Sequence, residues 1–347
     1  MNSRERVFAA LNRNEPDQVP IIEGLIDLTI INKIFPGSSY MDFVEKVGLD
    51  AVGINQPWDI STNIKWIDKQ RRIYQDKWGV VRQFTTEAVS YPLEGPIHSE
   101  KDLKKYIPPN PTDEALLGDL PQIVNKFRGK KAVMWLSHDA FIIPSFLRGM
   151  DNFLMDFIVN PNFARKLINL CVEFNVEEVK TAVRAGAEII ILGDDYAFKQ
   201  GPLMSPSQFR EFILPGLTKV VQTGKREGAF VIKHTDGNIW SLMDMLVEGG
   251  IDAINPLEPD AGMDIGKVKR KYGNKLCLVG NIDCGYLLSH ASVEKVIEAV
   301  RRCILEAAPG GGFIMSSSNS IHSSVKPENY MAMIKAAKKH GKYPIDF

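Results

Sequence analysis

The fold is decided by the stretch Val231-Ile232-Lys233-His234-Thr235-Asp236-Gly237-Asn238. An apolar strand begins just before it, ends in polar and reactive side chains, and leads at once into an amphipathic helix over residues 239–247. The same order of apolar strand, polar end and helix recurs along the chain. In a (β/α) barrel, the ends of the strands are where the chemistry is found.

Eight segments have the pattern of strands, and most are continuous apolar runs, as expected for parallel strands buried on both faces. They are residues 19–23, 51–55, 132–137, 187–194, 229–234, 253–257, 276–281 and 312–316. Helical patterns lie between them, and eight is the number of strands in a TIM barrel. We therefore predict one (β/α)8 domain over residues 1–347.

One region breaks the alternation of strands and helices. More than 70 residues separate the second and third predicted strands, and within them residues 73–84 read as a hairpin with its turn near Lys77–Gly79. We expect an insertion over about residues 61–130 that hangs over one end of the barrel.

The composition narrows the class of protein. The 42 basic and 42 acidic residues balance, so no basic surface for nucleic acid is expected. The apolar runs are shorter than the roughly 20 residues of a membrane span, and the charged start of the chain does not read as a signal peptide. The four cysteines form no CxxC pair, which favours a reducing, cytoplasmic location.

Polar side chains follow nearly every predicted strand, and a barrel would bring them together at one mouth. They are Glu23 and Asp27; Asn55 and Asp59; His138 and Asp139; Asp194 and Asp195; His234 and Asp236; Glu258 and Asp260; Asn281, Asp283 and Cys284; and Ser316 to Asn319 with His322. This mouth is acidic and contains histidine but no cluster of arginines.

Two pairs at this mouth suggest chemistry. His234 and Asp236 are two residues apart, so both can reach one ion, and Zn²⁺ is the first candidate for imidazole and carboxylate ligands. The alternative is a hydrogen-bonded structural pair. Asp194 and Asp195 end a buried strand, where carboxylates are costly unless they are used or paired. One of them could be a general base, or they could cap a turn and meet Lys199.

Several motifs resemble those of the uroporphyrinogen decarboxylase-like superfamily. They are Arg4-Glu5-Arg6-Val7-Phe8-Ala9-Ala10-Leu11 followed by Pro16-Asp17-Gln18-Val19-Pro20, then Gly280-Asn281-Ile282-Asp283, and finally Pro327-Glu328-Asn329. The resemblance spans nearly the whole chain and implies a (β/α)8 barrel. The superfamily contains the decarboxylase and cobalamin-dependent methyltransferases that use a zinc site.

The branches of this superfamily differ at the mouth. The decarboxylase holds its polycarboxylate substrate with R-Q-A-G-R after the first strand, where this chain has Glu23-Gly24-Leu25-Ile26-Asp27. Its G-H-G-I loop is matched by Ser318-Asn319-Ser320-Ile321. Methyltransferases that act on coenzyme M have H-x-C and a later cysteine, matched here by His234, Asp236 and Asn319. Because both sulfurs are replaced, the O-demethylases resemble this chain more closely.

The resemblance implies a methyltransferase that moves a methyl group between a small methylated donor, such as a methyl ether, and a corrinoid (cobalamin) carried on a partner protein. A zinc ion would assist as a Lewis acid. The predicted metal ligands are His234, Asp236 and Cys284, and the predicted catalytic residues are Asp194, Asp195 and Glu258. The predicted substrate-binding residues are Glu23, Asn55, Asn281, Asp283, Asn319 and His322.

Other interpretations stay open at this point. One is a carboxy-lyase acting on a small carboxylated substrate, with Lys233 or Lys199 as the anion contact. Another is a barrel that binds a small molecule without turning it over. The chain could also form a homodimer.

Overall fold

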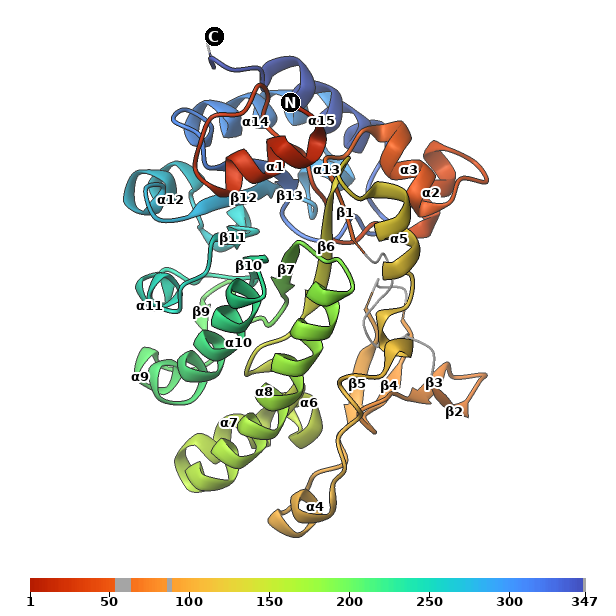
Figure 1. Ribbon diagram of the computed structural model, residues 1–347, viewed down its shortest axis with the longest axis vertical. Helices are drawn as coiled ribbons and strands as arrows, with labels where there is room; N and C mark the ends of the chain where they lie inside the picture. Colours follow the sequence, from red (N-terminus) through yellow and green to blue (C-terminus); the bar gives the residue numbers. More distant parts are fainter. Residues whose placement is uncertain (54–63, 86–88, 346–347) are drawn as a thin grey trace.

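The centre of the molecule is a curled sheet of seven parallel strands (Figure 1). The computed structural model describes residues 1–53, 64–85 and 89–345. Within them the strand order is β1-β6-β7-β10-β11-β12-β13, so neighbours in the sheet follow one another along the chain. The strands are β1 (Ala51–Val52), β6 (Ala132–Ser137), β7 (Ile189–Leu192), β10 (Phe230–His234), β11 (Ala253–Asn255), β12 (Cys277–Ile282) and β13 (Phe313–Ser317). This is a TIM-like α/β architecture.

The prediction of an eighth regular strand at residues 19–23 is wrong. That segment forms only an isolated parallel bridge, between Ile21 and Met315. On its other side the Ile21 amide donates to Asp50 Oδ2 at 2.8 Å, so a side chain takes the place of a ladder carbonyl. The Asp50 amide in turn donates to the Ile21 carbonyl at 2.7 Å. An extended but irregular segment therefore joins β13 to the start of β1.

Helices cover the outside of the sheet. In chain order they are α2 (Leu28–Ile34), α3 (Tyr40–Val47), α6 (Ile142–Arg148), α7 (Met150–Val159), α8 (Pro161–Arg184), α9 (Pro206–Gln208), α10 (Leu214–Arg226), α11 (Met243–Glu248), α12 (Ile265–Tyr272), α13 (Leu287–His290), α14 (Val293–Ala307) and α15 (Pro327–His340). A π-helix, η2 (Phe209–Ile213), joins α9 to α10, and a 3₁₀ turn, η3 (Pro259–Ala261), follows β11. A two-stranded hairpin of β8 (Ala197–Phe198) and β9 (Gly201–Pro202) follows β7. None of the described helices combines the length and the apolar character needed to cross a membrane.

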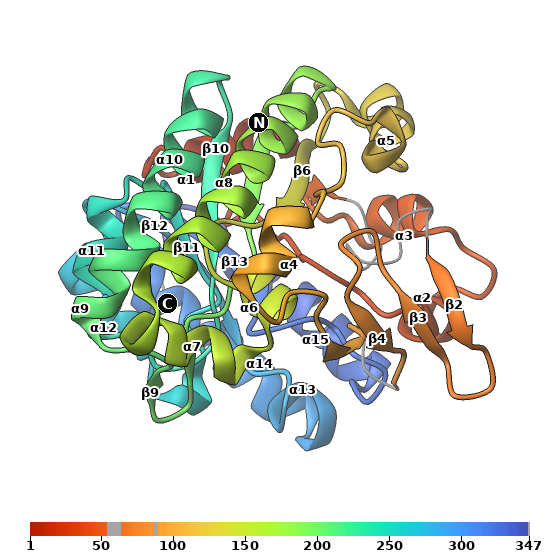
Figure 2. The ribbon, with the colours of Figure 1, turned by 90° about the horizontal axis from the view of Figure 1, so that it is seen from below.

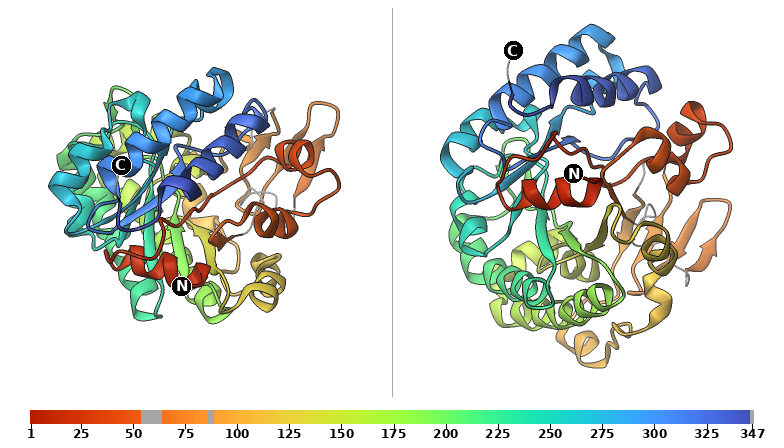
Figure 3. Two further views of the ribbon diagram at one scale, coloured as in Figure 1. Left: turned by 90° about the horizontal axis from the view of Figure 1, so that it is seen from above. Right: turned by 45° about the horizontal axis from the view of Figure 1, so that its top comes forward.

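The first helix, α1 (Ser3–Leu11), closes the amino end of the barrel, as Figure 3 shows. Asn2 and Glu5 form the capping box at its start. Its buried residues Val7, Ala10 and Leu11 belong to one apolar cluster with the first residues of several strands. This end of the barrel is therefore packed with apolar side chains, and the cavity described below lies at the carboxyl ends of the strands.

Between β1 and β6 the chain forms a separate antiparallel sheet, which lies at one side of the barrel in Figure 2. It contains β2 (Lys65–Asp68), β3 (Ile73–Gln75), β4 (Val81–Gln83) and β5 (Tyr91–Glu94). The helical pieces α4 (Glu100–Lys105), η1 (Glu114–Leu117) and α5 (Leu120–Phe127) follow it. Strands β3 and β4 pair around a turn in which Asp76 accepts hydrogen bonds from the Trp78 and Val80 amides.

Candidate active site at the mouth of the barrel

A cavity of about 260 Å³ opens at the carboxyl ends of the barrel strands. Most of its wall is apolar, while polar side chains gather at two places: around His234 and around His138. Arg82 of β4 contributes to the wall, as do Val89 and Ser90 just before β5. The cavity therefore suits a small ligand with an apolar body and a polar reacting group.

The first polar group consists of Asp195, His234 and Asp236. His234 Nε2 lies 3.6 Å from Asp236 Oδ1 and 3.9 Å from Asp195 Oδ1. One ligand atom from each residue falls within 4.8 Å of the others. In the part of the chain that the structure describes, this is the group of three whose atoms could hold a metal ion. Two carboxylates and one imidazole are a donor set that Zn²⁺ accepts.

A hydrogen bond fixes the tautomer of His234. Its Nδ1 lies 2.6 Å from Asn255 Oδ1, and Asn255 Nδ2 donates to the Val279 carbonyl at 3.1 Å. Because the amide nitrogen is committed to a carbonyl, the amide oxygen faces the ring and Nδ1 must carry the proton. The lone pair of Nε2 then faces the two carboxylates, as in metal-binding histidines with an outer hydrogen-bond acceptor.

Asp236 is the most constrained member of the cluster. Its Oδ2 accepts from Asn319 Nδ2 at 2.6 Å, whereas its Oδ1 is buried and accepts no hydrogen bond from any described residue. Burial raises the pKa of Asp236 to about 7, opposed by His234 and increased further by the charges of Asp195 and Glu258. A buried oxygen facing an imidazole lone pair is unfavourable unless a cation or a proton lies between them. The arrangement fits a bound metal ion.

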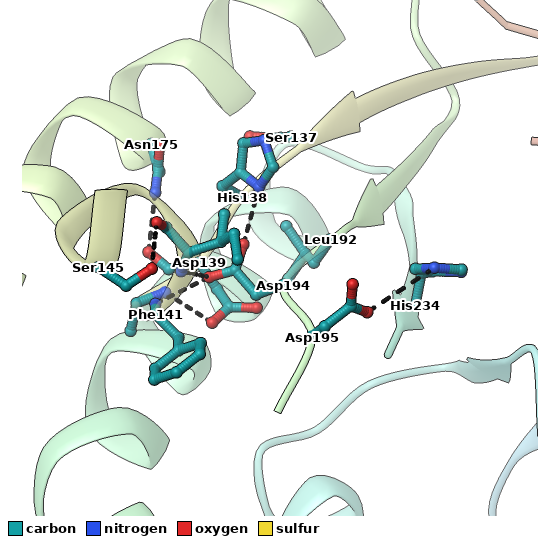
Figure 4. Close-up of polar contacts among 12 residues, drawn as sticks. Ser137, His138, Asp139, Phe141, Ser145, Asn175, Leu192, Asp194, Asp195 and His234 are labelled. Carbon is teal, nitrogen blue, oxygen red and sulfur yellow. Dashed lines mark hydrogen bonds and ion pairs between the residues drawn. The ribbon is translucent and has the colours of Figure 1, made fainter. Parts of the chain in front are cut away.

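The second polar group is a pair formed by His138 and Asp194, shown in Figure 4. His138 lines the cavity, and its Nδ1 lies 2.8 Å from Asp194 Oδ1. Asp194 Oδ2 accepts from the amides of Phe141 and Ile142 at 2.8 and 3.0 Å, at the start of α6. Burial would raise the pKa of Asp194, but His138, Lys233 and the Phe141 amide lower it overall, so the carboxylate is ionised. His138 Nδ1 is therefore the donor.

A buried ion pair lies behind this second group. Lys233 Nζ donates to Asp139 Oδ2 at 2.7 Å and to the carbonyls of Leu192 and Asp194 at 3.2 and 2.8 Å. Tyr196 donates its hydroxyl to Asp139 Oδ1 at 2.5 Å. Both Lys233 and Asp139 are completely buried and neither lines the cavity. Lys233 therefore supports the strand ends and is not placed to contact an anionic substrate.

The structure separates the residues predicted to be catalytic. Asp195 joins the cluster of possible metal ligands, while Asp194 points the other way, to His138. Glu258 lies outside the cavity lining, in the neighbouring groove, and accepts a hydrogen bond from the Gly237 amide at 2.9 Å. Through this hydrogen bond Glu258 holds the loop that carries Asp236.

The residues predicted to bind substrate are also dispersed. Asn319 lines the cavity, and His322 lies in the neighbouring groove with Glu258. Glu23 is buried beneath the cavity wall, where it accepts the Ser317 hydroxyl at 2.5 Å, and burial raises its pKa to about 8. Asn55 lies outside the described residues.

Asn281, Asp283 and Cys284 are not brought into the cavity. Asn281 donates to the Leu257 carbonyl at 2.8 Å, and Asp283 accepts the amides that begin α13. The Cys284 thiol is buried, contacts the Asn319 carbonyl at 3.3 Å and has its pKa raised by burial to about 12. Such a thiol resists becoming the thiolate that binds zinc. The structure thus places Asp195, and not Cys284, beside His234 and Asp236.

Asn255 and Arg82 are among the cavity residues that the sequence did not single out. Asn255 could have been found, because it pairs with His234 in the register of β10 and β11 and also ends its strand. Arg82 gave no local signal, since it comes from the antiparallel sheet. Its buried guanidinium bonds the Ser90 hydroxyl and carbonyl at 2.8 Å and lies over the Phe146 ring.

Comparisons with known proteins agree with this architecture. A curated relative named uroporphyrinogen decarboxylase, from Thioalkalivibrio sulfidiphilus, is 27% identical over 187 residues, which cover 52% of this chain and 50% of that protein. A methylated-thiol–coenzyme M methyltransferase from Methanosarcina mazei is 23% identical over 224 residues, which cover 65% of this chain and 58% of that protein. The chain thus spans about half the length of the first of these relatives.

A solved structure described as a methyltransferase from Methanosarcina mazei has the same fold. It superposes with a TM-score of 0.76 over 98% of this chain and 99% of that chain, at 19% sequence identity. The family model for uroporphyrinogen decarboxylase (URO-D) matches residues 76–340, which is most of the chain. The chain therefore belongs to the uroporphyrinogen decarboxylase family.

Proposed function

We propose that this protein is a metal-assisted methyltransferase that moves a methyl group from a small methylated donor, such as a methyl ether, to a corrinoid on a partner protein. The observation that carries the proposal is the cluster of Asp195, His234 and Asp236 in the wall of an open, mostly apolar cavity. The names of the Methanosarcina relative and of the superposed structure, both methyltransferases, add support.

Zn²⁺ would be held by His234 Nε2 and by one oxygen each of Asp195 and Asp236. The fit rests on the fixed tautomer of His234 and on the buried, unbonded Asp236 Oδ1. When bound, the ion would supply Lewis-acid polarisation of the donor heteroatom. The protein's own contribution is to orient the ligands, through Asn255 behind His234 and Asn319 beside Asp236.

The rest of the cavity would hold and orient the donor. Ile191, Ile232 and Val279 form apolar wall beside the cluster, which would seat a methyl or aryl group and exclude water from it. The corrinoid on the partner protein would supply the nucleophile that accepts the methyl group. The open mouth of the barrel is the side from which it would approach.

Decarboxylation of a porphyrinogen is a poorer match to the cavity. A substrate with many carboxylates needs several fixed cations, yet among the described lining residues Arg82 is the single arginine and no lysine is present. At the position of the arginine-rich motif, Glu23 is buried and Gly24 and Leu25 line the cavity. The electrostatics therefore favour a donor of low charge.

The proposal is tested by metal content and methyl transfer together. Elemental analysis would compare the wild type with His234→Ala and Asp236→Ala, and with His290→Ala as an exposed control outside the cavity. We expect about one zinc per chain in the wild type and the control, lost in the two cavity variants. The same proteins would be assayed with a panel of methoxylated donors and reduced cobalamin. Wild-type protein with no metal and no methyl transfer would refute the proposal.

A further inference from the structure

We propose that His138, oriented by Asp194, is the catalytic acid that protonates the oxygen of the donor as its methyl group departs. This inference rests on the proposed function and adds a second reacting group, separate from the metal ligands. It is carried by the position of His138 in the cavity wall and by the hydrogen bonds that hold Asp194.

His138 belongs to the cavity on geometric grounds. It follows β6 directly, and the neighbouring strand end contributes Gly193 to the same wall. A Cβ atom at Gly193 would lie 3.0 Å from Leu136 Cδ1 and 4.0 Å from His138 Cε1. The absence of a side chain there leaves room beside the Cε1 edge of the imidazole, next to the buried Nε2.

Asp194 gives the ring a defined orientation. Its carboxylate is anchored on the far side by the Phe141 and Ile142 amides, so it cannot rotate without breaking two hydrogen bonds. A buried carboxylate bonded to Nδ1 stabilises the protonated imidazole, as in hydrolases that pair histidine with aspartate. Asp194 is thus a positioning residue, and His138 is the group that meets the ligand.

The two polar groups of the cavity are held by separate contacts. Figure 4 shows Asp194 directed to His138 and Asp195 directed to His234, although the two aspartates are adjacent in sequence. Adjacent residues at a strand end point in opposite directions. Asp195 can therefore help to hold an ion that polarises the methyl donor, while Asp194 orients His138, the proton donor.

The proposed step balances as follows. The bond between the methyl carbon and the oxygen breaks, and its electron pair stays on the oxygen. A Nε2–H bond of the His138 imidazolium breaks, and its proton forms the new O–H bond. The methyl carbon forms its new bond with an electron pair from the reduced corrinoid, which is the acceptor of the proposed function. The neutral imidazole that remains keeps its Nδ1 proton, which stays hydrogen-bonded to Asp194. Its Nε2 then regains a proton from water.

The first test measures the tautomer of His138 without any turnover. Protein labelled with ¹⁵N in its 6 histidines would be examined by NMR, with His138→Ala to assign the signal. We expect the neutral ring to carry its proton on Nδ1 in the wild type. In Asp194→Asn the side-chain oxygen would still accept the hydrogen bonds of the Phe141 and Ile142 amides. The new NH₂ group would then donate to Nδ1 of His138, so the ring proton would move to Nε2. A wild-type ring protonated on Nε2 would overturn the proposal.

The second test uses leaving groups of different basicity. Methyl transfer to reduced free cobalamin would be measured from methoxybenzene and from 4-cyanomethoxybenzene, whose phenolate is the weaker base. We expect His138→Ala and Asp194→Asn to lose roughly 10²–10⁴-fold with methoxybenzene and about 10-fold or less with the cyano donor, because a weak base departs without a proton. Added imidazole should partly restore His138→Ala, and His290→Ala should match the wild type.

The outcomes separate the two proposals. Equal losses on both donors, or no loss, would show that the pair is structural and overturn the role of His138 while leaving the methyltransferase intact. A wild type that transfers no methyl group from any donor refutes the proposed function, and the role of His138 with it.

Discussion

Replacing Asn255 by leucine tests whether the fixed tautomer of His234 matters for metal binding. The substitution removes the 2.6 Å acceptor of the Nδ1 proton without touching a ligand atom. Loss of such an outer partner typically weakens metal affinity 10–100-fold, or about 1.4–2.7 kcal/mol. Asn255→Asp should bind zinc at least as tightly as the wild type, because a carboxylate is the stronger acceptor for the same proton.

Zinc affinity would be measured by competition with a chromophoric chelator, alongside chemical unfolding. Asn255→Leu also leaves the Val279 carbonyl without its donor, which should cost about 1–3 kcal/mol of folding stability. Asn329→Leu is the matched control, because Asn329 is buried and donates to three backbone carbonyls of residues that do not line the cavity. Both variants should be less stable, and only Asn255→Leu should lose affinity for zinc. Wild-type affinity in Asn255→Leu, or an equal loss in the control, would refute the reasoning.

Three further predictions concern buried groups. Burial raises the pKa of Glu23 to about 8 in the native state, whereas the unfolded chain loses this proton near the ordinary pKa of 4.5. The stabilisation that comes from holding the proton is therefore complete below pH 4.5 and is lost as the pH rises towards 8. The difference in stability between Glu23→Gln and the wild type should therefore grow by up to about 1.4 kcal/mol per pH unit in that window, and a flat difference in chemical unfolding would contradict this. Lys233→Met should destabilise the fold by about 3–5 kcal/mol by stranding Asp139, and Asp139→Asn added to it should recover part of the loss in the same unfolding assay. Gly237→Ala should lower both stability and zinc affinity, because a Cβ there would lie 2.6 Å from the Ala197 carbonyl carbon and Gly237 has a φ of +84°; retention of both properties would contradict it.

The positions of the barrel strands were predictable because the apolar runs are long and end in turn-forming residues. Residues 132–137 were expected as a strand and are found as β6, Ala132–Ser137. The segment at residues 19–23 has an equally apolar pattern, yet a side chain of Asp50 replaces one rung of its ladder. A hydrogen bond between a side chain and a distant backbone leaves no trace in hydrophobic periodicity, so the sequence could not reveal the interruption.

The candidate site was predictable at the level of strand ends, and less so at the level of partners. The alternation of side chains along a strand implies that Asp194 and Asp195 diverge, but the identity of their partners depends on neighbouring strands. Cys284 was expected among the metal ligands because it follows a strand end. It is instead buried against Asn319, since the chain turns at Asp283 to begin α13. Arg82 enters from the antiparallel sheet, whose placement no local pattern encodes.

The same alternation explains how the cavity cluster is kept in register. Strand β10 ends with Lys233 directed to Asp139 and His234 directed to the cavity, and Asp194 and Asp195 follow the end of β7 with the same alternation. Lys233 bonds the carbonyl of Leu192, the last residue of β7, and the carbonyl of Asp194, the residue before Asp195. The ammonium group therefore fixes the end of β7 against β10, and with it the spacing between Asp195 and His234. A buried charge is costly unless it is fully bonded, and here its bonds hold two possible metal ligands from different strands at one point.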